Sequence, residues 1–220
     1  MKPSPSKRQP KRRPSRPWPF TIIVLTGSIA MGKSTATALL RRFKWPALDA
    51  DAEVHRLYAS GGAAVGPIAQ AFGDSVIGPH GVDRPTLGRA VFGNPTALAR
   101  LERITHPLLV QGRHRFLLQA ALTRRRAVVL DVPLLFETMR YRTRDMVVVV
   151  SAPGFLQRQR AMARPGMTAE RLKSILDRQT PDYLKRRQAD LVVPSGMGKR
   201  EALRRLLTLR KVGSSRFSRP

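Results

Sequence analysis

Four residues near the N-terminus have the types and the spacing needed to hold phosphate groups. Gly27, Gly32, Lys33 and Ser34 form the pattern G-x-x-x-x-G-K-S. Successive backbone N–H groups of such a loop can surround an anion, a lysine can reach the terminal phosphates, and a serine hydroxyl can bind magnesium. The pattern predicts a site for a nucleoside triphosphate. The alternative is a glycine turn that happens to contain a lysine.

The segments on either side of this pattern support the phosphate-binding interpretation. An apolar run, Phe20 to Leu25, comes directly before it and is typical of a buried strand, and helical spacing follows from Lys33 to Phe43. A loop between a strand and the positive end of a helix is the setting that phosphate binding requires. We therefore expect the whole loop and the start of the helix to line the nucleotide: Gly27, Ser28, Ile29, Ala30, Met31, Gly32, Lys33, Ser34 and Thr35.

Two carboxylates follow the next predicted strand, Pro46 to Leu48. They are Asp49 and Asp51, and open parallel sheets bind ligands at the carboxyl ends of their strands. Phosphoryl transfer needs an acceptor hydroxyl held in line with the phosphate, and an aspartate can accept that hydroxyl proton. Only one of the two is expected to serve. The alternative is that either one caps the helix beginning near Ala52.

A third carboxylate ends the strand predicted at Ala127 to Leu130. Asp131 comes next and leads into Val132 to Glu137. This position suits an outer or water-mediated magnesium ligand, as in other phosphoryl-transfer sites. The alternative is a cap for the following helix.

Two arginines, Arg160 and Arg164, lie four residues apart after the strand predicted at Met146 to Val150, so they share one face of a helix. Two guanidinium groups there would suit a lid that closes over phosphates, neutralises charge in the transition state and excludes water. In a chain so rich in arginine, the alternative is an ordinary solvent-exposed helix face.

The order of apolar strands and helical patterns predicts an α/β fold with a doubly wound parallel sheet of about five strands. The fifth strand is predicted at Leu191 to Val193. Between the second and third strands no strand is as strong as its neighbours, so a helical substrate-binding insertion is expected there. Further helical patterns are Pro107 to Leu122, Pro153 to Ala163, Thr168 to Asp177 and Lys199 to Leu209.

These elements divide the chain into a single domain with a tail at each end. The predicted parts are a proline-rich basic arm at 1–19, a sheet core at 20–51, 124–156 and 188–210, an insertion at about 52–123, a lid at about 157–187 and a basic tail at 211–220. The arm has seven positive charges, no acidic residue and repeated prolines, and such a composition predicts disorder.

The charge of the chain is unusual, with 41 basic residues, 14 acidic residues and a formal net charge of +27. Such a charge can attract nucleic acid. The arm lacks the interleaved aromatic residues that stack on bases, so we favour a solubilising role and do not expect a nucleic-acid partner. There is no cysteine and no apolar stretch of the roughly 18 residues that cross a membrane. The prediction is a cytoplasmic protein with no membrane partner, and the sequence does not give its oligomeric state.

Three classes of protein could use a triphosphate held in this way. A regulatory GTPase would carry an Asn-Lys-x-Asp segment, but the one asparagine is Asn94, in a Gly-Asn-Pro turn. A nucleic-acid-linked ATPase is usually larger and holds a second carboxylate that activates water. A small-molecule kinase fits the length and the carboxylates best.

Several motifs together resemble the dephospho-CoA kinase family over about Thr21 to Leu209. They are LTGSIAMGKST (25–35), LDAD (48–51), THPL (105–108), DVPLLFE (131–137), Gln157 with Arg160 and Arg164, Arg178-Gln179, and ADLVV (189–193). The resemblance implies a three-part P-loop kinase with a sheet core, a helical substrate domain and a lid. It also implies transfer of the γ-phosphoryl of ATP to the ribose 3′-hydroxyl of dephospho-CoA, with Mg²⁺ as cofactor.

The resemblance also implies roles for individual residues. Asp51, rather than Asp49, matches the family's catalytic carboxylate, with Lys33 and Arg160 as further catalytic groups. The insertion would bind the acceptor near His106, which otherwise reads as a structural histidine before Pro107 at a helix start. The alternative functions are a P-loop kinase of another nucleotide or nucleoside and a nucleic-acid-binding ATPase.

The chain departs from the family pattern at three positions. His55 stands where many members have an arginine, with Arg56 next to it. Ala30 stands in place of a loop glycine. This substitution causes little backbone strain if the φ of Ala30 is negative. Ser195 stands near the place where relatives show an asparagine beside the base.

Overall fold

A computed structural model describes residues 18–138 and 145–214. Its centre is a five-stranded parallel sheet in the order β2-β5-β1-β6-β7. The strands are β1 (Thr21–Thr26), β2 (Ala47–Asp49), β5 (Ala127–Asp131), β6 (Met146–Ser151) and β7 (Leu191–Pro194). Every predicted strand is present and its ends differ by one residue at most, and the predicted α/β class with a parallel sheet of about five strands is confirmed.

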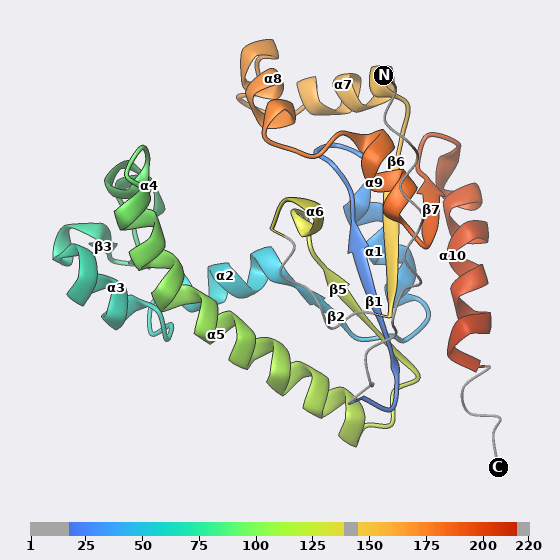
Figure 1. Ribbon diagram of the computed structural model, residues 1–220, viewed down its shortest axis with the longest axis horizontal. Coiled ribbons are helices and arrows are strands. Elements are labelled where there is room, and N and C mark those ends of the chain that lie inside the picture. Colours follow the sequence, from blue (N-terminus) through green and yellow to red (C-terminus); the bar gives the residue numbers. More distant parts are fainter. Residues whose placement is uncertain (1–17, 139–144, 215–220) are drawn as a thin grey trace, which may run out of the picture.

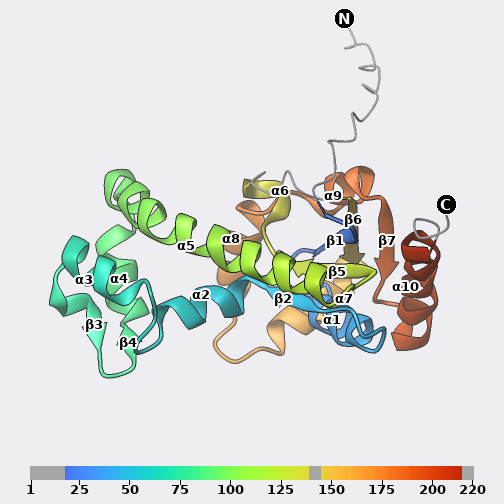
Figure 2. The same cartoon turned by 90° about the horizontal axis from the view of Figure 1, so that it is seen from below.

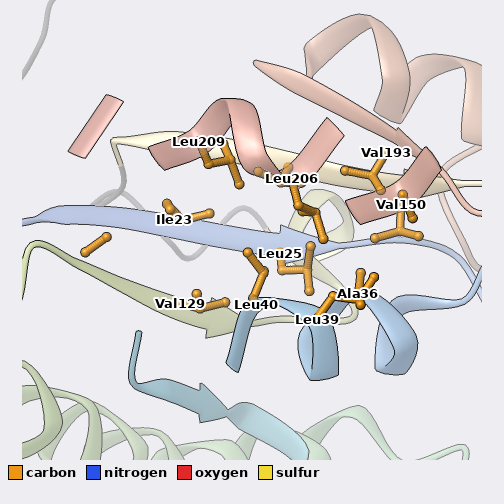
Figure 3. Packing of buried hydrophobic residues seen from close by; sticks show 13 residues of the cluster. Ile23, Leu25, Ala36, Leu39, Leu40, Val129, Val150, Val193, Leu206 and Leu209 are labelled. Carbon is orange, nitrogen blue, oxygen red and sulfur yellow. The ribbon is translucent and has the colours of Figure 1, made fainter. Parts of the chain in front are cut away.

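β1, β5, β6 and β7 consist mainly of apolar residues, as strands covered by helices on both faces do. On one face, α1 (Lys33–Arg41) and α10 (Gly198–Ser214) pack on Ile23 and Leu25 of β1. Figure 3 shows Leu206 and Leu209 of α10 beside these side chains, with Leu39 and Leu40 of α1. Burial of one such side chain stabilises the fold by about 1.5–3 kcal/mol.

The alternating strand residues, among them Ile22 and Val24, face the other side and pack on Leu117 and Ala120 of α5 (Pro95–Leu122) and on Leu135 of α6 (Leu135–Thr138). Trp18 packs there too, with its ring 5.7 Å from that of Phe20. Trp18 therefore belongs to the packed part of the chain, although the predicted basic arm includes residues 18 and 19. The rest of the arm, residues 1–17, lies outside the described residues.

The insertion after β2 has a small apolar core of its own. Figures 1 and 2 show it as a group of helices at one end of the molecule, joined to the sheet by α2 and by the long helix α5. Leu57, Ile68, Val76 and Leu87 are buried in this core. Its elements besides α5 are α2 (Ala50–Tyr58), α3 (Val65–Phe72), the 3-10 turn η1 (Asp74–Val76), the hairpin β3 (Ile77–Gly78) and β4 (Gly81–Val82), and α4 (Arg84–Val91).

The largest error among the predicted helix boundaries is the start of α5. The pattern predicted a helix beginning at Pro107, but α5 begins at Pro95 and continues through Pro107. Asn94 caps the true start, because its side chain accepts the Ala97 N–H at 3.0 Å. Leu108 and Leu109 pack in the insertion core, and this packing offsets the backbone hydrogen bond that Pro107 cannot make.

The segment predicted as a lid, at about 157–187, contains three helices. They are α7 (Gly154–Met162), α8 (Ala169–Asp177) and α9 (Asp182–Gln188). In Figure 1, α7 and α8 lie above the end of the sheet that carries the glycine loop. Ala161 and Leu172 pack on Ala30 of that loop. The predicted tail at 211–220 overlaps the end of α10, and residues 215–220 lie outside the described residues.

No helix among residues 18–138 and 145–214 has both the length and the apolar character needed to cross a bilayer.

Candidate active site

The glycine loop runs close over the end of β6, and this path depends on Gly27. A Cβ added at Gly27 would lie 2.6 Å from the Val150 carbonyl oxygen, which real side chains do not tolerate. Gly32 has φ +87° and caps α1 without a side-chain hydrogen bond. A residue with a side chain rarely adopts that φ. The two glycines therefore set the shape of the loop.

The loop leaves backbone donors available at the start of α1. The N–H groups of Ala30, Gly32, Lys33 and Ser34 donate to no acceptor in the described parts of the chain. The positive end of the helix dipole points the same way. These groups line a cleft of about 650 Å³ together with the rest of the loop. The arrangement can hold an anion such as a triphosphate.

Lys33 does not extend freely into the cleft. Its ammonium forms an ion pair with Asp131 Oδ1, and the Thr37 hydroxyl donates to Asp131 Oδ2 at 2.7 Å. Asp131 is only 3% exposed. It does not cap the next helix, because α6 begins four residues later at Leu135. Lys33, Thr37 and Asp131 thus form a linked group beneath the loop, and Lys33 can turn from Asp131 toward phosphates.

The two carboxylates after β2 have different positions. Asp49 ends the strand and caps α2, since its Oδ1 accepts the N–H groups of Asp51 at 2.9 Å and Ala52 at 3.1 Å. The alternative prediction, that one of these carboxylates caps the following helix, is therefore confirmed for Asp49. Asp51 lies in the first turn of α2 and lines the 650 Å³ cleft opposite Lys33. Its carboxylate is the one available to a ligand.

A second pocket of about 440 Å³ adjoins the first. Asp51 and Pro133 line both. The second pocket combines apolar walls, including Leu109 and Val110 of α5, with the polar groups of His106 and Arg113. Two ligands, one in each pocket, would meet at Asp51.

His106 lies on the wall of this second pocket, but its structural context differs from the expectation. It is in the middle of α5, not at a helix start. The helix presents it to the pocket together with Val110, one turn further on. The lining position agrees with the predicted acceptor region, and a direct ligand contact stays a prediction.

The two predicted lid arginines both line the first cleft. Arg160 is held by Ser195, with Nη1 donating to the hydroxyl at 2.9 Å and Nη2 to the backbone oxygen at 2.9 Å. The Ser195 hydroxyl donates in turn to the Met31 oxygen at 2.6 Å. Arg160 is therefore fixed against the loop. Arg164 lies two residues beyond the end of α7 at Met162, so the expectation that the two arginines share one helix face is wrong, because the helix ends before Arg164.

Comparison with known proteins identifies the family. The family model for dephospho-CoA kinase matches residues 21–200. A dephospho-CoA kinase of Rhodospirillum rubrum is 51% identical over 201 residues, covering 90% of this chain and 95% of that protein. The chain belongs to the dephospho-CoA kinase family. The resemblance seen in the sequence motifs, and the kinase class with ATP as a substrate, are thereby confirmed.

Solved structures support the predicted fold. The protein TT1252 from Thermus thermophilus superposes with a TM-score of 0.73 at 34% identity, covering 89% of this chain and 98% of that one. A dephospho-CoA kinase from Campylobacter jejuni superposes with a TM-score of 0.61 over 90% of this chain and 99% of its own, and at 22% identity it supports the fold alone.

Two departures from the dephospho-CoA kinase pattern have structural outcomes. Ala30 has φ +58°, so the condition of a negative φ is not met, and the left-handed conformation costs about 1–2 kcal/mol. At the other departure, His55 contacts Arg84 Nη1 through its Nε2 at 2.7 Å. Arg56 would have to rotate to take the place of the family arginine, since its Nε donates to Glu53 at 3.1 Å.

Sequence reasoning missed Thr37 and gave no role to Gln157 and Gln179. The signal for Thr37 was its spacing, because it follows Lys33 by four residues and so lies on the same helix face. For the glutamines, nothing short of the folded chain shows that both reach the backbone of Ile29.

We predict that Gly27→Ala raises the KM for ATP at least about tenfold, because the new methyl group forces the loop away from Val150. Steady-state kinetics with varied ATP measure this. Gly88→Ala is the matched control, since a Cβ at Gly88 in α4 meets no atom within 4 Å. It should leave the KM unchanged and stabilise the helix by about 0.5–1 kcal/mol. Equal KM values for the two variants would contradict the close approach.

Proposed function

We propose that this protein transfers the γ-phosphoryl group of ATP to the ribose 3′-hydroxyl of dephospho-CoA, giving CoA and ADP, the last step of CoA synthesis. The observation that carries the proposal is the position of Asp51 on the common wall of the two pockets. Family membership supports the identity of the acceptor. The two ligands would meet at the one carboxylate that can accept the hydroxyl proton.

Binding of ATP would place its phosphates against the free N–H groups at the start of α1. Lys33 would then exchange Asp131 for phosphate oxygens, and this keeps its positive charge paired throughout. Arg160 and Arg164 would close the cleft from the lid side and exclude water, which would otherwise compete as acceptor.

Dephospho-CoA would occupy the 440 Å³ pocket with its 3′-hydroxyl toward Asp51. The apolar side chains of Leu109 and Val110 can cover a flat ring, and Arg113 and His106 can contact polar or charged groups. Asp51 would accept the hydroxyl proton as the oxygen attacks the phosphorus. This is general-base catalysis combined with in-line positioning.

The residues around the phosphate loop fit a magnesium ion. Within the described ranges there is no group of three or more His, Asp or Glu side chains that could hold a metal alone. Magnesium in kinases usually takes one or two protein oxygens, water and substrate phosphates. Ser34 in the loop and Asp131, directly or through water, would supply the protein oxygens. When bound, the ion would neutralise charge on the phosphates.

The proposal includes no nucleic-acid partner and no membrane partner, and it leaves the cytoplasmic location as predicted from the sequence.

We predict that Asp51→Asn lowers kcat by about 10²–10⁴-fold, because the amide cannot accept the hydroxyl proton. The Kd for ATP should change little, as the phosphate contacts come from the loop. Asp49→Asn is the matched control in the same segment. Asparagine caps helices as well as aspartate does, so that variant should keep near-normal turnover. Equal turnover in the two variants would contradict the role of Asp51.

A panel of acceptors tests the substrate. Purified protein with magnesium ATP and dephospho-CoA should give CoA, which mass spectrometry distinguishes by the added phosphate group. A much higher kcat/KM for another nucleotide or nucleoside would assign a different acceptor. ATP hydrolysis that rises with added polynucleotide, together with no phosphorylation of dephospho-CoA, would favour the nucleic-acid-linked class instead.

A further inference from the structure

The peptide groups of Ile29, in the middle of the phosphate loop, are held from two directions by glutamines. Gln157 Nε2 donates to the Ile29 carbonyl oxygen at 2.9 Å. The Ile29 N–H donates to Gln179 Oε1 at 3.1 Å. The two glutamines are 22 positions apart along the chain, and both belong to motifs to which the proposed chemistry gives no role.

One glutamine side chain donates a hydrogen bond to Ile29 and the other accepts one. The backbone atom that each contacts determines its role. A carbonyl oxygen can only accept a hydrogen bond and an N–H can only donate one. Gln157 must therefore present its NH₂ group to Ile29, and Gln179 must present its oxygen. Gln157 is buried, with 8% of its surface exposed, so water cannot readily replace its contact.

The glutamines lie at the two ends of the lid. Gln157 is in the first turns of α7, and Gln179 follows α8. The chain just beyond Gln179 is tied to the core, since the Thr180 N–H donates to Glu137 Oε1 at 2.8 Å. Both ends of the lid are thus attached to the body of the molecule close to Ile29.

Glu137 is a firm anchor because of a buried partner. The fully buried Lys185 ammonium lies 2.8 Å from Glu137 Oε1. Burial works to raise the pKa of Glu137, but the nearby Lys185 ammonium and the hydrogen bond from the Thr180 N–H outweigh it and hold the pKa below its usual value. The carboxylate therefore stays charged and keeps its hold on the end of the lid.

We propose that Gln157 and Gln179 are positioning residues that set the orientation of the Ile29 peptide and hence the path of the phosphate loop. They also confine lid movement to the helices between them. Neither residue takes part in proton transfer. The proposal rests on the proposed function in one respect, namely that this loop binds the phosphates of ATP.

Ile29 consequently has a different role from its neighbours in the loop. Its N–H is already used by Gln179, whereas those of Ala30 and Gly32 have no partner in the described chain. The Ile29 peptide is therefore held in place, and its position sets the direction of the neighbouring N–H groups that have no partner.

The test uses the opposite duties of the two glutamines. Hydrogen exchange of the Ile29 amide is measured in the full chain without nucleotide. Gln179→Leu removes the acceptor and should speed exchange about five- to tenfold, whereas Gln179→Glu keeps an acceptor and should exchange as the unchanged protein does. At Gln157 the glutamate variant is expected to be the more disruptive of the two. Gln157→Glu turns a carboxylate toward the Ile29 oxygen and should disturb the loop more than Gln157→Leu.

Kinetics separate positioning from general stability. Gln157→Leu and Gln179→Leu should raise the KM for ATP about tenfold and leave the KM for the acceptor unchanged. Gln159→Leu on α7 and Gln188→Leu on α9 are matched controls on exposed positions and should change neither constant. The unfolding temperature of each variant shows that it is folded.

The proposal is overturned if Gln179→Glu exchanges as fast as Gln179→Leu, or if the leucine variants match the controls in the KM for ATP. The exchange measurement needs neither ATP nor an acceptor. It therefore decides the positioning role even if the acceptor proves to be something other than dephospho-CoA.

Discussion

The in-register pairing of three parallel strands is the constraint on which the site depends. Leu25 of β1 pairs with Asp131 of β5, and Asp131 pairs with Asp49 of β2. The three strands therefore end side by side, so the phosphate loop, the partner of Lys33 and the start of α2 all meet at one edge. A shift of one residue in β5 would turn Asp131 to the opposite face of the sheet. The ion pair with Lys33 would then be lost.

Much of this arrangement could be predicted because the relevant signals are local. Continuous apolar runs such as Met146 to Val150 mark strands buried on both faces, and the G-x-x-x-x-G-K-S pattern marks the turn between the first strand and α1. Parallel strands place their carboxyl ends together, so Asp51 and Asp131 could be assigned to the same edge.

The features that could not be predicted depend on contacts between distant segments. The sequence pattern predicts a helix start at Pro107, but α5 continues through Pro107 because the residues after it pack in the insertion core. Ala30 has a positive φ in a loop that packs on Ala161 and Leu172, a strain that the sequence does not reveal. Without the family resemblance, which favoured Asp51, the spacing of the residues did not tell Asp49 and Asp51 apart, because their surroundings depend on where the strand ends.

The structure thus describes two ligand pockets that share one carboxylate, with a loop and a lid fixed to each other at Ile29. Such an arrangement is built for direct transfer between two bound ligands, with no covalent intermediate on the protein. ATP made chiral at the γ-phosphorus with oxygen isotopes measures this most directly. Direct transfer to the acceptor at Asp51 predicts product with inverted configuration at phosphorus. Retention of configuration would require two successive transfers and would contradict the account.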